Sequence, residues 1–120
     1  MDKKQFPAGK GLSIHAVIYV PSTSDVDKVI STVQFNRRIK ETEKFLSKSF
    51  GGSTRVSGIG SYISSKDNLV QEKVAKVEVF TTRKNYNKND EKIRKYLEKK
   101  KNVWGQEAIS YEFEETLYFV

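Results

Sequence analysis

The sequence predicts an α+β domain in which two helices cover one face of a four-stranded antiparallel sheet. The chain has 120 residues, which is enough for one hydrophobic core and too short for two. Four segments rich in β-branched and aromatic residues are interrupted by two segments with helical periodicity. Seven Phe, six Tyr and one Trp are more aromatic residues than a disordered chain carries, so a folded globule is expected.

The first half of the chain predicts a strand followed by a helix. Residues 12–20 (LSIHAVIYV) are mostly β-branched or aromatic, and Pro21 stops the run, which indicates a strand. Apolar residues then recur at intervals of three, four and seven. This spacing predicts an amphipathic helix that is strongest over 33–49, whereas 25–32 could form a loop. Two glycines at 51–52 are expected to end the helix.

The second half predicts a hairpin, a second helix and a last strand. Residues 54–63 and 69–82 both indicate strands, and the polar segment 64–68 between them has the chemistry of a hairpin loop. The second helix is expected to start at Asn89 and to run to about Lys101, because acidic residues follow its start and lysines crowd its end. Residues 108–120 alternate between apolar and polar side chains, which predicts one final strand.

The resulting order βαββαβ is the split βαβ arrangement of ferredoxin-like folds. Right-handed crossovers would place the first strand in the middle of the sheet, beside the third. We expect residues 1–11 to form a flexible lead-in and residues 12–120 to form one domain.

Charge and composition restrict the partners and the location. Lys and Arg number 22 and Asp and Glu number 15, so the net charge of +7 favours polyanionic partners without specifying one. The absence of Cys excludes a disulfide scaffold, a thiolate zinc site and a cysteine nucleophile. The first apolar run, residues 14–20, is too short for a signal peptide or a membrane helix, so we expect a soluble cytoplasmic protein.

The most distinctive local feature is the glycine-rich segment after the first predicted helix. Glycines let backbone N–H groups approach a ligand, and the neighbouring hydroxyl and guanidinium groups suit an anion. The predicted ligand-binding residues are Gly51, Gly52, Ser53, Thr54, Arg55, Gly58 and Gly60. The structural alternative is a Gly-Gly helix stop, followed by two strand glycines that accommodate a neighbouring aromatic ring.

A resemblance to known sequences involves the same glycine-rich segment. Phe-Gly-Gly-x-Thr at 50–54, Gly-x-Gly-x-Tyr at 58–62 and Glu72 after the hairpin resemble a signature of small uncharacterised phage and plasmid proteins. The resemblance covers about residues 14–80 and implies a mobile-element origin without an established activity. The side chains it implicates are Thr54, Arg55, Tyr62 and Glu72. Pairing of Glu72 with Arg55 is the structural alternative to a functional role.

A basic block offers a second functional hypothesis. Residues 83–101 contain nine basic and three acidic side chains, and such a block could neutralise nucleic-acid phosphates. The candidate contacts are Lys84, Lys88, Lys92, Arg94, Lys95 and Lys99. An ordinary solvated helix is the alternative. RNA recognition on the open sheet face is disfavoured, because Glu112 and Glu114 would repel phosphates there.

Enzymatic chemistry has weaker support, and whether the protein is an enzyme stays open. His15, Tyr62 and Glu72 are the candidate acids or bases of a metal-independent phosphodiesterase, although a half-buried ring is the simpler explanation of His15. No metal or cofactor motif is present, so none is predicted. The leading hypothesis is a protein that binds a small anionic ligand of nucleotide type near the glycines. An open sheet face with exposed apolar side chains also predicts a homodimer.

Overall fold

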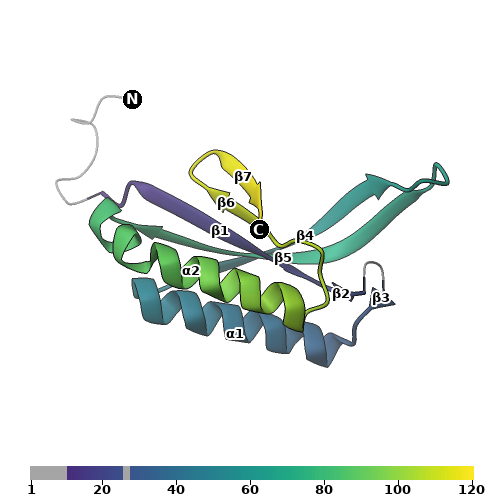
Figure 1. The fold of residues 1–120 in the computed structure, drawn as a ribbon, viewed down its shortest axis with the longest axis horizontal. Coiled ribbons are helices and arrows are strands. Elements are labelled where there is room, and N and C mark those ends of the chain that lie inside the picture. The colour runs from purple at the N-terminus through teal and green to yellow at the C-terminus, as the bar shows by residue number, and fades with distance from the viewer. Residues whose placement is uncertain (1–10, 26–27) are drawn as a thin grey trace.

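The computed structural model describes residues 11–25 and 28–120, so the predicted lead-in lies outside it except for Gly11. The protein has an α+β fold with two helices on one face of a five-stranded antiparallel sheet of order β4-β5-β1-β6-β7 (Figure 1). The elements are β1 (Ile14–Pro21), β2 (Thr23–Ser24), β3 (Lys28–Val29), α1 (Thr32–Phe50), β4 (Thr54–Ile63), β5 (Leu69–Thr81), α2 (Arg83–Val103), β6 (Ser110–Phe113) and β7 (Thr116–Phe119). Strands β2 and β3 form a separate two-stranded ribbon.

The first strand, β1, lies in the middle of the sheet beside β5, as predicted. β1 pairs with β5 on one side and with β6 on the other, and both pairings are antiparallel. The core lies between the sheet and the helices. Among its most deeply buried side chains are Ile18, Val20, Leu46, Val77, Ile93 and Leu97. No helix in the described part of the chain is both long and apolar enough to cross a membrane.

The first helix begins and ends as its cap residues dictate. Ser31 is the N-cap, and its hydroxyl accepts the backbone N–H of Gln34 at 3.2 Å, while the Gln34 side chain accepts the Ser31 N–H at 3.3 Å. Gly51 follows the helix in the left-handed conformation, with φ of +90°, and its N–H donates to the Ser47 carbonyl. The predicted helix stop at the two glycines is therefore confirmed.

The second helix starts six residues before the predicted Asn89. Thr82 is its N-cap, with its hydroxyl accepting the Asn85 N–H at 3.2 Å. Asn89 is buried inside the helix, where its side-chain amide donates to the carbonyl of Asn85 at 2.9 Å. The prediction was wrong because the polar segment 85–89 resembles a loop, whereas burial of Tyr86 against the sheet makes it a helical turn.

The last predicted strand, 108–120, is a hairpin, which gives the sheet five strands instead of the four expected of a ferredoxin-like sheet. Glu114 occupies the left-handed region with φ of +58° at the turn between β6 and β7. Its N–H donates to the carbonyl of His15, and its carboxylate accepts the N–H of His15 at 2.8 Å. These two bonds to β1 stabilise the turn that separates β6 from β7.

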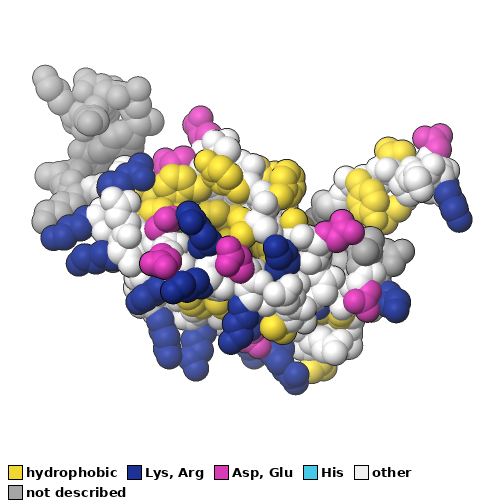
Figure 2. Space-filling model, viewed as in Figure 1, with side chains coloured by type: hydrophobic (Ala, Val, Ile, Leu, Met, Phe, Trp, Pro, Cys, Tyr) yellow, Lys and Arg dark blue, Asp and Glu magenta, His cyan; other side chains and the backbone are white. Residues whose placement is uncertain are grey.

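The hairpin of β4 and β5 extends from the body of the molecule as an arm (Figure 1). It carries exposed apolar side chains, which appear on the arm in Figure 2. The most exposed of them are Ile59, Ile63 and Leu69.

Candidate functional site

The candidate site lies on the face of the sheet that the helices leave open. Successive side chains of a strand point to opposite faces, so the register of the strands decides which residues share a face. Gly58 and Gly60 pair with Val74 and Glu72, and these positions alternate with the buried residues of the core face. The open face therefore carries, among the predicted residues, His15, Thr54, Gly58, Gly60, Tyr62 and Glu72.

A cavity of about 440 Å³ lies on this face beside the two glycines. Gly58 and Gly60 contribute bare strand backbone, and the segment 106–110 forms another wall. Four residues of β1 and β5 that line the cavity have polar side chains, namely Tyr19, Glu72, Lys73 and Lys76, of which Lys73 alternates to the other face of β5. The cavity thus combines a flat backbone surface with a carboxylate, an ammonium and a phenol.

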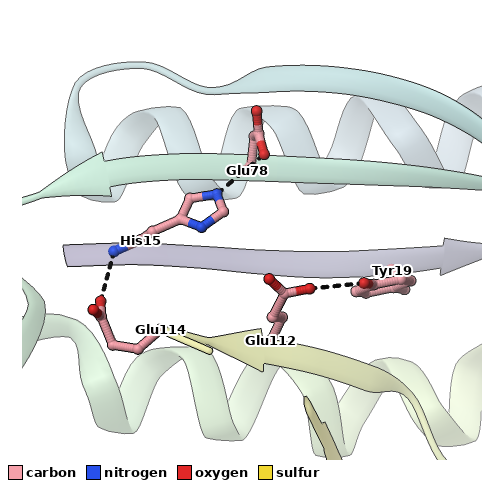
Figure 3. A network of polar contacts seen from close by, with 5 residues as sticks. All are labelled: His15, Tyr19, Glu78, Glu112 and Glu114. Atoms are coloured by element: carbon pink, nitrogen blue, oxygen red, sulfur yellow. Dashed lines mark hydrogen bonds and ion pairs between the residues drawn. The ribbon is translucent and has the colours of Figure 1, made fainter. Parts of the chain in front are cut away.

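The hydroxyl of Tyr19 is held in place by Glu112 (Figure 3). It donates to a carboxylate oxygen of Glu112 at 2.8 Å, and the ammonium of Lys76 lies 5.1 Å from the centre of the Tyr19 ring. Burial raises the pKa of Tyr19, the hydrogen bond to Glu112 adds to this effect, and Lys76 opposes it. Tyr19 is therefore a neutral phenol whose proton is committed to Glu112 and whose oxygen can accept a hydrogen bond.

Glu72 lies opposite Gly60 and pairs with no cation within residues 11–25 and 28–120. Glu72 and Arg55 do not form the ion pair that the sequence offered as a structural alternative. Arg55 points to the other face of β4, where its Nη1 lies 4.0 Å from a carboxylate oxygen of Glu43. The carboxylate of Glu72 is therefore available to a ligand.

Arg55 lines a second cavity, of about 620 Å³, on the helix side of the β4–β5 arm. Gly58 and Glu72 also line this cavity, although their strand positions face the open side of the ribbon, so the glycine-rich segment is divided between its two faces. Gly51 serves as the end of α1, and the Ser53 hydroxyl is hydrogen-bonded to the Ser47 hydroxyl at 2.9 Å. The structure consequently does not gather the whole predicted segment, 51–60, around one ligand.

The three candidate acids or bases are also separated. Tyr62 is a diagonal neighbour of Glu72 on the open face, towards the tip of the arm. His15 pairs with Phe80, eight residues from Glu72 along β5, a distance of about 27 Å at 3.4 Å per residue. Its ring stacks on Phe80 at 4.5 Å, and its Nε2 lies 3.1 Å from the Glu78 carboxylate (Figure 3).

Within the described residues, no three His, Asp or Glu side chains are grouped so that they could hold a metal ion. Tyr19 and Lys76 were not among the predicted site residues. The alternation of side chains along β1 and β5 indicates that both residues share one face of the sheet. The register that brings them beside Gly58 cannot be read from the sequence.

The basic candidates lie on α2, away from the open face. The lysines among them are exposed, namely Lys84, Lys88, Lys92, Lys95 and Lys99. Arg94 is also exposed, and its Nη2 lies 4.0 Å from a carboxylate oxygen of Asp90.

Comparison with known proteins identifies the fold. No protein-family model and no curated protein sequence matches the chain. The solved structure of a phage SAM lyase in complex with S-methyl-5'-thioadenosine superposes with a TM-score of 0.63 and 15% sequence identity, covering 95% of this chain and 93% of that chain. The same enzyme in its apo state gives a TM-score of 0.63 at 16% identity, covering 95% of each chain. The chain therefore shares the fold of a phage SAM lyase.

Proposed function

We propose that this protein binds a nucleoside of the S-methyl-5'-thioadenosine type in the cavity beside Gly58 and Gly60. The observation that carries the proposal is the carboxylate of Glu72, which forms no ion pair among the described residues and lies at the rim of a cavity floored by bare backbone. Its volume of about 440 Å³ lies in the range typical of small-molecule sites. The phage enzyme with the same fold holds this nucleoside, which supports the choice of ligand class.

The chemistry of the cavity suits a nucleoside better than a nucleotide. A flat base can lie against a strand that lacks side chains, as β4 does at Gly58 and Gly60. A carboxylate is an acceptor only, so Glu72 can accept from the ribose hydroxyls or from the amino group of the base. Because Glu72 offsets one of the two lysines that line the cavity, Lys73 and Lys76, the rim carries only a small excess of positive charge for a polyphosphate.

Calorimetric titration tests the binding proposal. We expect S-methyl-5'-thioadenosine and adenosine to bind the wild-type protein, and Glu72→Gln to weaken this binding at least tenfold. Glu91→Gln is the matched control, because Glu91 is an exposed carboxylate on α2. Absence of binding to the wild type, or equal losses in the two variants, would refute the proposal.

Cleavage of SAM is a second candidate function, favoured by a fold likeness that spans 95% of the chain. Release of S-methyl-5'-thioadenosine from SAM breaks one carbon–sulfur bond. The electron pair of this bond goes to the sulfonium sulfur, which becomes neutral, so the leaving group needs no proton. The carboxylate within the same substrate can attack the carbon that is released, which closes a lactone and balances the reaction. The protein would then act by holding the substrate in the reactive conformation.

Chromatography of SAM incubated with the protein tests this second function. We expect S-methyl-5'-thioadenosine to appear faster than in buffer alone, and Glu72→Gln to slow its appearance. Binding of the nucleoside without any turnover of SAM would leave a binding protein and exclude the lyase.

A further inference from the structure

The positive charge of the protein is concentrated on its helix layer. Helix α1 carries five basic and two acidic side chains, so its net charge is +3. Helix α2 carries nine basic and three acidic side chains, so its net charge is +6. These charges exceed the +7 of the whole chain, so the rest of the molecule is net negative by two charges. The sheet and the helix layer therefore present opposite electrostatic surfaces.

The cations of each helix form a stripe on its outer face. On α2 the exposed lysines follow one another at intervals of four, four, three and four, and on α1 the exposed cations follow at three, four and four. We call these nine side chains the basic helix surface: Arg37, Lys40, Lys44, Lys48, Lys84, Lys88, Lys92, Lys95 and Lys99. Residues that pack against the sheet, such as Leu46 and Ile93, lie outside both stripes.

The two stripes belong to neighbouring antiparallel helices. The Nζ of Lys100, near the end of α2, donates to the Glu41 carboxylate in the middle of α1 at 2.6 Å. Nearer the other end, the side-chain amide of Asn89 donates to the carbonyl of Ser49 at 3.4 Å. Figure 2 shows Lys and Arg side chains gathered along these helices. The stripes thus form one continuous surface.

Most of these cations keep their charge unneutralised. Three of the five acidic side chains of the two helices pair outside this surface, namely Glu41 with Lys100, Glu43 with Arg55 and Asp90 with Arg94, and Glu98 forms no ion pair within the described residues. Only Lys95 of the basic helix surface is paired, with Glu91 at 3.4 Å. The other eight cations form no ion pair within residues 11–25 and 28–120.

We propose that the basic helix surface binds the phosphate backbone of double-stranded nucleic acid without reading its sequence. Lysines 84 to 99 extend over about 22 Å at 1.5 Å per residue, a row of point charges that can follow the phosphates of one strand. The surface carries no aromatic side chain on which unpaired bases could stack, so a duplex is the expected form. The nucleoside cavity lies on the opposite face of the sheet, which leaves both sites free to act independently.

A lipid surface is the less favoured partner. Membrane-bound surface helices insert apolar side chains below their cationic rim. The exposed large apolar residues of the helix layer are Val33 and Val103 only, within the described part of the chain. Apart from these two valines, the two helices offer cations without exposed large apolar side chains that could enter a bilayer.

Fluorescence anisotropy with a labelled 20-base-pair DNA duplex tests this proposal. If about four phosphates are neutralised, raising the salt from 50 to 200 mM should weaken binding about 100-fold. The double variant Lys88→Glu with Lys92→Glu should weaken binding more than tenfold at 50 mM salt. The number of neutralised phosphates, obtained from the slope of log K against log salt concentration, should fall by about two. Lys28→Glu with Lys66→Glu makes the same change in net charge outside the helices and should weaken binding less than threefold.

Three outcomes would overturn the proposal. They are no duplex binding at 50 mM salt, equal losses in the two double variants, and binding to phosphatidylserine vesicles without binding to the duplex. Thermal unfolding followed by circular dichroism must show both double variants folded. All four substituted lysines are exposed, so this condition is expected to hold.

Discussion

Gly60 lies directly opposite Glu72 across β4 and β5, so the cavity wall at this point consists of backbone and one carboxylate. A Cβ atom added to Gly60 would lie 3.9 Å from the Glu72 carbonyl oxygen and 4.0 Å from its Cγ, which are ordinary contacts. At Gly58 the nearest contact would be the Val74 side chain at 3.7 Å. The strand therefore tolerates alanine at both positions, and the absence of side chains there serves the cavity.

Alanine at Gly60 should separate stability from binding. Glycine inside a strand is less stable than alanine by roughly 0.5–1 kcal/mol, so Gly60→Ala should raise the free energy of unfolding by that amount. The added methyl group should obstruct a base that lies on the strand and weaken binding of S-methyl-5'-thioadenosine at least fivefold. Urea unfolding and calorimetry measure the two effects. Ser61→Ala, on the other face of β4, is the control, and unchanged binding in Gly60→Ala would place the ligand elsewhere.

Arg38 should be the most sensitive charged residue for stability. Its buried guanidinium donates to the carbonyls of Pro21, Thr23 and Trp104, at 2.9, 2.8 and 3.3 Å, and burial lowers its pKa. Lysine cannot make these bonds with one ammonium, so Arg38→Lys should cost about 2–4 kcal/mol in urea unfolding. Arg37→Lys, at an exposed neighbour, should cost less than about 0.5 kcal/mol. Equal costs would contradict a structural role of Arg38.

Stability should fall steeply in alkali because three tyrosines are buried. Burial raises the pKa of Tyr86 and that of Tyr96 to about 12, and burial together with the hydrogen bond that Tyr111 shares with Tyr86 raises the pKa of Tyr111. Unfolded tyrosines lose their protons from about pH 10 while these stay neutral, so the unfolded state binds fewer protons. The stabilisation is complete below pH 10 and is lost between pH 10 and 12, by about 1.4 kcal/mol per pH unit for each tyrosine.

Substitution of one tyrosine tests this explanation. Tyr96→Phe should reduce the pH dependence of the unfolding free energy by about 1.4 kcal/mol per unit above pH 10. The Thr42 hydroxyl, which contacts the Tyr96 hydroxyl at 2.9 Å, retains its bond to the Arg38 carbonyl, so the variant should fold. Tyr118→Phe, at an exposed position, is the control. An unchanged slope in Tyr96→Phe would assign the alkaline loss to other groups.

The order of the elements could be predicted because each has a strong local signal. Strand β4 has the predicted bounds, and α1 ends at the predicted glycine. The early start of α2 and the break between β6 and β7 depend on contacts distant in sequence. Asn89 is helical because it is buried beside α1, and Glu114 turns the chain where its carboxylate meets β1. Neither contact can be predicted from the amino-acid composition of the segment around Asn89 or Glu114.

The site was predictable only in part for a related reason. Gly58, Gly60 and Glu72 stood out by residue type, and all three line the same cavity. Proximity in the sequence predicts that Arg55 joins them, although its odd spacing from Gly58 places it on the other face of the ribbon. Tyr19 and Lys76 join the site through the register of three strands, and register is a property of the folded sheet.

Substitution of Arg55 decides between the two faces of the arm. Its ion pair with Glu43 is long, at 4.0 Å, and partly exposed, so Arg55→Ala should change the free energy of unfolding by less than about 1 kcal/mol. Binding of S-methyl-5'-thioadenosine should change less than twofold, because Arg55 lines the cavity on the helix side and Glu72 has no ion pair with it. Calorimetry on Arg55→Ala and Glu72→Gln in parallel makes the comparison. A tenfold loss in Arg55→Ala would show that the ligand occupies the helix side of the ribbon, as expected of an anion held by the guanidinium.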